Sequence, residues 1–333
     1  MKEIYYKTRK DSENMKKIVI ITCFFGKKPS DFDMWLKSCK NNPSIDWLIF
    51  TDMEIKEYEI IKNVTFIKTT LKKIKSLIEK KLKMKVVLEK AYKLCDYKPL
   101  YGYIFSNYIK NYDFWGYCDI DMIFGDIRTF LTEKILNEYK KIYSLGHLSL
   151  YKNELENNKR FMTIKNGVDY RKAFETENIY VFDELLGIFK LYNLNEMYLK
   201  NDYADINRFN KKSLILNNAD NNIKNHRYQT FLYENSKLYI IFIEKNRIYK
   251  KEIIYIHYSG RTFKTINSES FFITTEGFIK YNNENIDLKI IKKLNNRGSI
   301  IVEKIITNTR TLYYRLRRKI KKVMTLIKER NNK

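Results

Sequence analysis

The chain has 333 residues, of which 44% are hydrophobic, and a formal net charge of +25. This length and hydrophobic content allow one sizeable core. No apolar run reaches the roughly 20 residues of a membrane-spanning helix, and the charged N-terminus lacks the apolar core of a signal peptide. The four cysteines are scattered without a Cys-x-x-Cys pair, which argues against a disulfide framework or a zinc site. We therefore expect a cytoplasmic protein with reduced thiols.

The positive charge by itself permits a nucleic acid or an anionic membrane as a partner. Because the chain is rich in Lys, Asn, Ile and Tyr, its total charge is partly a matter of composition, and the distribution of charge is more informative. Residues 303–333 hold eleven Lys or Arg and two Glu, a net charge of +9. This basic tail is a distinct segment.

The predicted elements begin after a polar extension at 1–14. Residues 17–25 contain a continuous apolar run that ends at Gly26, which is typical of a buried parallel strand. Further strands are expected at 47–50, 64–67, 114–118, 142–145, 148–151, 238–243 and 253–257, and helices at 31–41, 71–82, 87–94, 100–109 and from Asp126 to about 140. The Asn-rich residues 152–235 predict irregular structure with short helices.

This alternation of strands and helices predicts an α/β fold with a mostly parallel, doubly wound sheet. We expect a polar extension at 1–14, one domain at 15–295 and a basic helix at 296–333.

Residues 114–118 form a short apolar strand that runs directly into Asp119 and Asp121. Isolated buried carboxylates are costly, so such a pair either forms ion pairs or binds a metal. A hard divalent cation suits carboxylate oxygens, and open α/β sheets hold ligands at the carboxyl ends of their strands. The spacing alone is weak, because Asp31 and Asp33 repeat it where a helix cap is the simpler interpretation.

Several segments together resemble a known family more specifically than the Asp-x-Asp spacing does. They are Thr51-Asp52, Lys93 to Pro99, Trp115 to Asp121, Gly146 to Asn153, Phe182 to Glu184 and Ile256-His257. Their order resembles a bacterial family of glycosyltransferase-like proteins associated with surface-polysaccharide synthesis, distantly related to glycosyltransferases of the GT-A fold. The resemblance covers roughly residues 17–280.

The resemblance implies a Rossmann-type GT-A-like domain that uses a nucleoside-diphosphate sugar. Residues implied to hold the nucleotide or its sugar are Thr22, Cys23, Phe24, Asp52, Asp96 and Lys98. Asp119 and Asp121 would carry Mn²⁺ or Mg²⁺ at the diphosphate. Lys98 is implied to pair with the diphosphate, although a surface lysine beside Pro99 is an alternative.

His257 follows an apolar strand and precedes Tyr-Ser-Gly-Arg. A neutral imidazole is a good manganese ligand. The segment is similar to the end of certain retaining GT-A enzymes, where a metal-binding His precedes Gly and a phosphate-binding Lys. Arg261 stands here in place of that Lys. A histidine satisfied within the core remains the alternative.

An inverting enzyme also requires a carboxylate base near the acceptor hydroxyl. Asp183 and Glu184 are the candidates, and a carboxylate pair at a helix N-terminus is the alternative. The predicted function is metal-dependent transfer of a sugar to a cell-surface polysaccharide or glycolipid. A metal-dependent phosphotransferase or nuclease, or a basic nucleic-acid-binding protein, are the other candidates. The sequence leaves open the sugar, the acceptor and whether the anomeric configuration is retained.

The basic tail carries an apolar stripe of Leu312, Leu316, Ile320, Val323 and Ile327 at helical spacing. A basic amphipathic helix suits an anionic membrane surface. We expect peripheral association with the inner face of the cytoplasmic membrane, where lipid-linked saccharide acceptors are found, and no nucleic-acid partner. A helix packed on the catalytic domain is the alternative.

Overall fold

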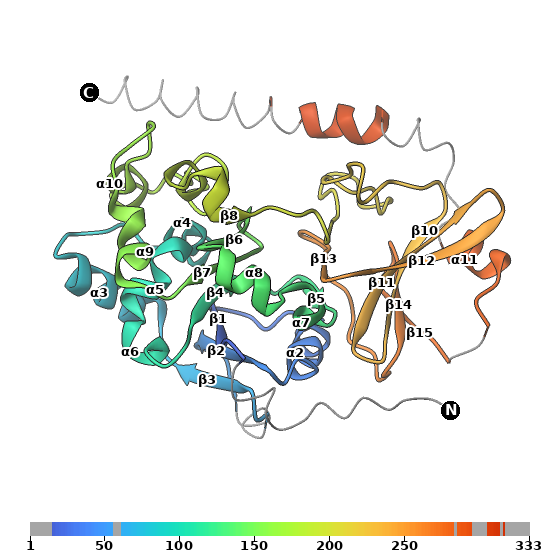
Figure 1. The fold of residues 1–333 in the computed structure, drawn as a ribbon, viewed down its shortest axis with the longest axis horizontal. Coiled ribbons are helices and arrows are strands. Elements are labelled where there is room, and N and C mark those ends of the chain that lie inside the picture. The colour runs from blue at the N-terminus through green and yellow to red at the C-terminus, as the bar shows by residue number, and fades with distance from the viewer. Residues whose placement is uncertain (1–14, 56–60, 283–284, 295–304, 314–315, 317–333) are drawn as a thin grey trace. The chain divides into compact units, whose positions relative to one another are not determined.

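The computed structural model describes residues 15–55, 61–282, 285–294, 305–313 and 316 (Figure 1). Its contacts divide the chain into two compact units. The first unit comprises the chain up to Lys28, Cys39–Ile120 and Ile127–Lys200. The second comprises Pro29–Ser38, Asp121–Asp126 and the chain from Asn201 onward. The single domain expected over 15–295 stays a prediction, and the polar extension expected at 1–14 lies outside the described residues.

The first unit is built on a sheet that, among the described residues, has seven strands in the order β3-β2-β1-β4-β7-β6-β8. The strands are β1 (Ile18–Phe24), β2 (Ile45–Thr51), β3 (Val64–Lys68), β4 (Phe114–Cys118), β6 (Lys141–Leu145), β7 (Leu148–Lys152) and β8 (Met197–Tyr198). Strands β3, β2, β1 and β4 run parallel, β7 is antiparallel to β4 and β6, and β8 is parallel to β6. The predicted α/β fold with a large, mostly parallel sheet is confirmed.

Short helices cover this sheet (Figure 1). They are α3 (Leu71–Leu82), η2 (Ala91–Lys93), α4 (Leu94–Tyr97), η3 (Lys98–Leu100), α5 (Tyr101–Ile104), α6 (Ser106–Ile109), α7 (Ile127–Phe130), α8 (Glu133–Glu138), α9 (Leu155–Lys159), η4 (Arg160–Met162), α10 (Tyr170–Phe174), η5 (Ile188–Leu191) and η6 (Leu194–Glu196). Many are single turns, so packing on the sheet, rather than intrinsic helix propensity, stabilises them.

Strand β4 occupies the middle of the sheet and is buried at every residue. Trp115 stacks on Tyr151 of the adjacent β7 with ring centroids 4.6 Å apart, and its Nε1–H donates to the Asn158 side chain at 2.6 Å. Burial of large aromatic groups with their polar atoms satisfied makes β4 a rigid support. The residue that follows Cys118, Asp119, is therefore held at a defined position.

The second unit contains two further sheets among its described residues. A five-stranded antiparallel sheet has the order β12-β11-β10-β14-β15, and a three-stranded sheet has the order β5-β13-β9. The elements are α2 (Phe32–Lys40, whose last residues belong to the first unit), β5 (Met122–Phe124), β9 (Ala204–Asp205), β10 (Gln229–Glu234), β11 (Lys237–Glu244), β12 (Arg247–Ile253), β13 (Tyr255–His257), β14 (Phe271–Ile273), β15 (Phe278–Lys280) and α11 (Leu288–Leu294).

The helix expected at 87–94 is present only in its second half, as η2 and the start of α4. Residues 85–89 form no helix, and the backbone N–H of Val87 donates to the carbonyl of Phe174 instead of to a helical neighbour. Of the five-stranded antiparallel sheet, β11 was expected at 238–243, whereas β10 lies in the segment expected to be irregular. Strands β14 and β15 are only three residues each and lack a readable alternation. The short helices expected within 152–235 are present.

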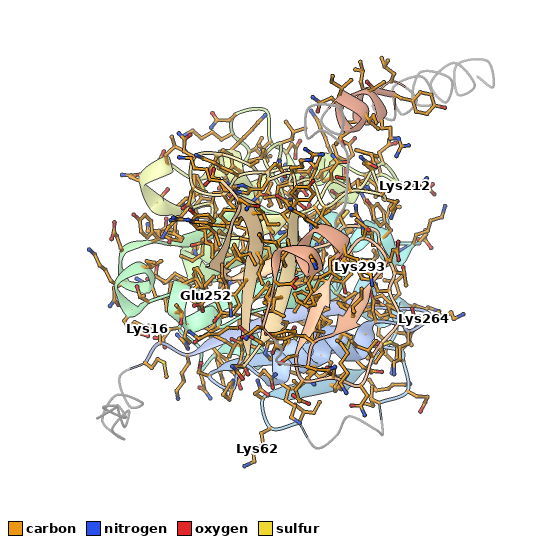
Figure 2. The ribbon with its side chains drawn as sticks, turned by 90° about the vertical axis from the view of Figure 1, so that its right-hand side faces the viewer. Lys16, Lys62, Lys212, Glu252, Lys264 and Lys293 are labelled. Atoms are coloured by element: carbon orange, nitrogen blue, oxygen red, sulfur yellow. The ribbon has the colours of Figure 1, made fainter. Side chains whose placement is uncertain are left out.

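Exposed lysines occur in both units, such as Lys62 in the first and Lys264 in the second (Figure 2). The described residues include no helix that is long and apolar enough to cross a membrane.

Candidate active site

Strand β4 delivers Asp119 to the carboxyl end of the parallel part of the sheet. The backbone N–H of Asp119 donates to the carbonyl of His147 at 3.0 Å, which fixes the chain where it leaves the strand. His147 belongs to the tight connection between β6 and β7 and is itself buried. The carboxylate thus lies where α/β sheets commonly bind ligands.

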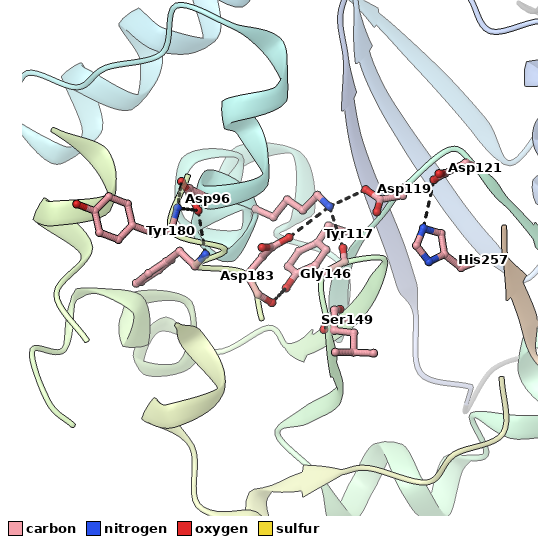
Figure 3. Close-up of polar contacts among 12 residues, drawn as sticks. Asp96, Tyr117, Asp119, Asp121, Gly146, Ser149, Tyr180, Asp183 and His257 are labelled. Atoms are coloured by element: carbon pink, nitrogen blue, oxygen red, sulfur yellow. Dashed lines mark hydrogen bonds and ion pairs between the residues drawn. The ribbon is translucent and has the colours of Figure 1, made fainter. Parts of the chain in front are cut away.

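Lys98 joins Asp119 and Asp183 in one charged cluster. Figure 3 shows the two carboxylates. The Nζ of Lys98 lies 2.6 Å from Asp119 Oδ1 and 3.4 Å from Asp183 Oδ2, and donates to the Gly146 carbonyl at 2.8 Å. Burial opposes the charge of this ammonium, but the two carboxylates raise the pKa of Lys98 well above its usual value. Lys98 is therefore a permanent cation within the first unit. It is not the surface lysine that was the alternative interpretation of its sequence.

Asp183 is 2% exposed, so its pKa differs from that of a surface carboxylate. Burial raises its pKa to about 7, against the attraction of Lys98 and with repulsion from Glu184 and Asp119. Within the described part of the chain, its Oδ1 accepts no hydrogen bond. A carboxylate that is half ionised near neutral pH, with an oxygen still able to accept a proton, has the properties of a general base.

A constrained turn holds Asp183 in place. Both oxygens of Asp96 accept the backbone N–H of Tyr180, at 3.2 and 3.0 Å, and Oδ1 also accepts that of Phe182, at 2.9 Å. Between them Val181 adopts a φ of +55°, a conformation that costs a β-branched residue about 1–3 kcal/mol. The Asp96 bonds therefore stabilise a backbone that the sequence would otherwise avoid.

The expected contact of Asp96 with a nucleotide sugar stays a prediction. The residue is fully buried, and its carboxylate is bonded by backbone N–H groups and by Lys93, whose Nζ lies 2.8 Å from Oδ2. In this structure the carboxylate supports the turn before Asp183.

Gly146 is also required by this cluster. A Cβ atom at this position would lie 2.2 Å from Asp183 Oδ2, far inside van der Waals contact. Any side chain here would displace Asp183 from Lys98, so the glycine preserves the geometry.

In the second unit, β13 brings His257 beside β5 and β9. His257 is opposite Met122 in the antiparallel β5 and opposite Asp205 in the parallel β9. Its Nε2 lies 3.5 Å from Asp121 Oδ1, and its Nδ1 lies 2.8 Å from Asp205 Oδ1. Residues that are far apart in the sequence thus form a compact carboxylate–imidazole group (Figure 3 shows Asp121 and His257).

Backbone donors complete the surroundings of Asp121. Its Oδ2 accepts the N–H of Gly260 at 2.7 Å, and its carbonyl accepts the N–H of Tyr258 at 3.1 Å. Burial opposes ionisation, but His257 and Gly260 lower the pKa of Asp121 well below its usual value. Burial likewise opposes protonation of His257, yet Asp121 and Asp205 raise its pKa to about 10. The group has a strong preference for a cation between its carboxylates.

Arg261 has a structural role in the second unit. Its side chain is buried and donates to the carbonyls of Tyr258, Asn207, Asn210 and Ser213 at 2.9–3.1 Å. These bonds hold the guanidinium against the loop at 207–213. The phosphate contact expected from the sequence stays a prediction.

The residues expected to hold the nucleotide lie at the ends of β1 and β2. Asp52 accepts the N–H of Gly26 at 2.8 Å, which joins the loops after these strands. Thr22 is buried and its Oγ1 lies 3.3 Å from Cys118 Sγ, whereas Cys23 and Phe24 are partly exposed. Burial raises the pKa of Cys23 to about 12, so it remains a neutral thiol. Their contact with a nucleotide stays a prediction.

Asp205 is the principal residue that sequence reasoning missed. Strand β9 has two residues and lies within an Asn-rich segment, so no periodicity marks it. Its pairing with His257 depends on a parallel strand contact across 52 positions.

Asp121 and His257 fit a divalent cation. A carboxylate and an imidazole nitrogen face each other, and both are ligand types that manganese accepts. Asp119 is separated from Asp121 by one residue, so their Cα atoms are at most about 7 Å apart whatever the arrangement of the units.

The chain belongs to the DUF6625 family, a family of unknown function, whose sequence profile matches residues 20–282. No curated protein matches it. Among solved structures, it is similar to the galactosyltransferase LgtC in complex with donor and acceptor sugar analogs, at 11% identity and a TM-score of 0.36 over 56% of this chain and 75% of that one. It is also similar to the glycosyltransferase GlyE of Streptococcus pneumoniae TIGR4, at 14% identity and a TM-score of 0.36 over 57% of this chain and 46% of that one. At these TM-scores neither likeness bears on the activity of this chain.

Proposed function

We propose that this protein is a metal-dependent glycosyltransferase of GT-A-like architecture that moves a sugar from a nucleoside-diphosphate donor to a saccharide acceptor. The observation that carries the proposal is the pairing of Asp121 with His257, 3.5 Å apart at the junction of β5 and β13. This pair unites the Asp-x-Asp motif with the distant histidine, as the sequence resemblance implies for a metal site.

Asp121 and His257 would hold Mn²⁺ or Mg²⁺, with Asp119 as a further ligand. The metal, when bound, neutralises charge on the departing diphosphate. The permanent charge of Lys98 balances Asp119 and Asp183. Such fixed charges act strongly in a site of low dielectric constant.

Asp183 would take the proton of the acceptor hydroxyl. A pKa of about 7 suits a base that works near neutral pH. Glu184, its neighbour in the same turn, is the alternative base. If the anomeric configuration is retained, neither carboxylate need act in this way.

The acceptor would be a cell-surface polysaccharide or a lipid-linked saccharide, with the enzyme on the inner face of the cytoplasmic membrane. Residues 305–313 are helical and present an unusual pattern. Thr307 is buried and its Oγ1 accepts from Asn210 at 3.0 Å, whereas Ile305, Leu312 and Tyr313 are 57–59% exposed. Thr307 thus contacts the rest of the second unit, while three apolar side chains of the same helix are exposed, which favours an external apolar partner.

The test is a screen of nucleotide sugars with Mn²⁺ that measures release of nucleoside diphosphate. We expect release from a subset of sugars, its loss with excess chelator, and its loss in Asp121→Asn. Asp126→Asn, a carboxylate in the same chain segment, is the matched control and should keep activity. Cleavage of nucleic acid or release of inorganic phosphate, without sugar release, would instead indicate a nuclease or phosphotransferase.

A further inference from the structure

The imidazole of His257 has a carboxylate at each ring nitrogen. Asp205 Oδ1 lies 2.8 Å from Nδ1, within ordinary hydrogen-bond distance. Asp121 Oδ1 lies 3.5 Å from Nε2, which is longer than a good hydrogen bond. The two ring nitrogens therefore differ. Nδ1 is hydrogen-bonded to Asp205, whereas Nε2 faces Asp121 without a close contact.

Asp205 is itself held rigidly. The Asn217 side chain donates to Asp205 Oδ2 at 2.8 Å, and the Asn217 backbone N–H donates to the Asp205 carbonyl at 2.7 Å. The Asp205 N–H donates to the side chain of Asn218 at 3.0 Å. With both carboxylate oxygens bonded and the residue 8% exposed, the orientation of Asp205 is fixed before any ligand arrives.

The hydrogen bonds that hold Asp205 continue from Asn217 to Asn207. The side-chain amide of Asn207 donates to the Asn217 side chain at 2.8 Å, while its Oδ1 accepts the backbone N–H groups of Phe209 and Asn210. The Asn-rich segment, which reads as irregular, is thus a hydrogen-bonded scaffold behind His257.

We propose that Asp205, oriented by Asn217, is a positioning residue that keeps a hydrogen on His257 Nδ1, so that the proton on Nε2 is the one that leaves when a metal binds on the side of Asp121. This inference rests on the proposed metal-dependent function. A carboxylate behind a ligating histidine fixes its tautomer and ring orientation, and loss of such a partner typically weakens metal binding about 10–100-fold.

Asp205→Asn is the informative change because it preserves the shape and alters the hydrogen-bonding capacity. Because the Asn217 side chain donates to the Oδ2 position, an amide there keeps its oxygen toward Asn217 and turns its NH₂ group toward Nδ1. Donation to Nδ1 favours the hydrogen on Nε2 and removes the lone pair from the metal side. Asp220→Asn is the matched control, since Asp220 lies in the same segment but bonds the N–H groups of Asn222 and Ile223.

The experiment measures the affinity of the full-length variants for Mn²⁺ alone, by electron paramagnetic resonance of free ion, and the ¹⁵N shifts of the His257 ring with diamagnetic Zn²⁺ bound. We expect wild type and Asp220→Asn to bind alike with the hydrogen on Nδ1. Asp205→Asn should bind about 10–100-fold more weakly, with the Nδ1–H signal lost. Asn217→Ser is a milder change, because it alters only the residue that holds Asp205, and it should weaken Mn²⁺ binding less. It provides the test if Asp205→Asn does not fold.

Equal Mn²⁺ affinity and an unchanged ring tautomer in Asp205→Asn, or in Asn217→Ser where the first does not fold, would overturn the positioning role and leave the proposed function standing. A wild-type protein that binds neither ion would instead remove the metal site, and with it both proposals.

Discussion

The Oδ1 atom of Asp96 accepts the backbone N–H of Phe182 at 2.9 Å, one residue before Asp183. This bond connects a buried helical turn to the candidate base across 86 positions of the chain. Because Val181 lies in the left-handed region between the two N–H groups that Asp96 binds, the turn persists only while the carboxylate compensates for its strain. Asp96 therefore acts on Asp183 through the backbone.

Asp96→Asn should destabilise the protein. The change leaves the Lys93 ammonium, 4% exposed, without its carboxylate, and breaking a buried ion pair in this way costs about 3–5 kcal/mol. Urea unfolding should show the loss of free energy of unfolding. Asp169→Asn makes the same change at the N-cap of α10, where Asn caps as well as Asp does, so this control should leave the free energy of unfolding almost unchanged. An Asp96→Asn variant as stable as wild type would show that the turn needs no such support.

Asp183→Asn should bind the donor normally yet transfer sugar about 10²–10⁴-fold more slowly, the usual effect of losing a general base. Glu184→Gln is the matched control, because it changes the adjacent carboxylate in the same turn. If the control variant alone is slow, the base is Glu184. Unchanged transfer in both would exclude either as the base. Rates of sugar transfer and calorimetric binding of the nucleoside diphosphate separate these results.

The transfer rate should depend on pH through Asp183. Burial raises its pKa to about 7, so the carboxylate that accepts a proton is the minor form below pH 7 and the major form above it. Transfer should therefore rise with pH and reach half of its plateau near pH 7. A profile that stays flat from pH 5 to 9 would be inconsistent with this base.

Lys141 should make folding stability depend on pH. The residue is fully buried and donates to two neutral acceptors, the Tyr143 carbonyl at 2.6 Å and Ser149 Oγ at 2.9 Å. Burial lowers its pKa to about 7, with Asp183 opposing the shift. Between about pH 7 and its usual value, the unfolded chain binds a proton that the folded chain does not, so stability rises with pH.

The variant Lys141→Met removes this titration. The free energy of unfolding of the variant minus that of wild type should fall as pH rises from 7 to 10, whatever the difference at one pH. Lys140→Met, where the side chain is 41% exposed and pairs with Glu196, should keep the wild-type slope. If the free energies of unfolding of Lys141→Met and wild type change with pH in parallel, burial does not lower the pKa of Lys141.

How far the sequence predicts this structure depends on the range of the interactions. The apolar runs of β1 and β4 mark buried strands because their burial is continuous, and both strands are found where expected. Asp121 and His257 were singled out separately from their local context. Their approach, in contrast, depends on the pairing of β5 with β13, which no local pattern encodes.

Roles that depend on distant backbone groups do not show in the sequence. Asp96 and Arg261 are polar residues beside motifs, which suggests ligand contacts, and the structure shows that each also satisfies buried backbone groups. Asp205 was overlooked for the converse reason, since a two-residue strand in an Asn-rich segment carries no periodic signal. Buried polar satisfaction is a property of the fold, so a single sequence reveals it poorly.

The basic tail provides the last prediction. Ending the chain after Leu316 removes residues 317–333, with eight Lys or Arg and one Glu, and retains the bond between Thr307 and Asn210. Ile320, Val323 and Ile327 of the predicted stripe lie outside the described residues. Each basic group near an anionic surface contributes about 1 kcal/mol, so vesicle binding should fall by orders of magnitude at physiological salt.

Sedimentation with vesicles that contain phosphatidylserine measures this binding, and donor hydrolysis measured in parallel should be unchanged. Leu312→Ser in the full chain is the complementary variant, because it alters an exposed apolar side chain without changing charge. It should weaken vesicle binding modestly and leave the salt dependence intact. If the shortened chain sediments with vesicles as well as the full chain does, the tail is not the membrane contact and the exposed face of 305–313 serves another partner.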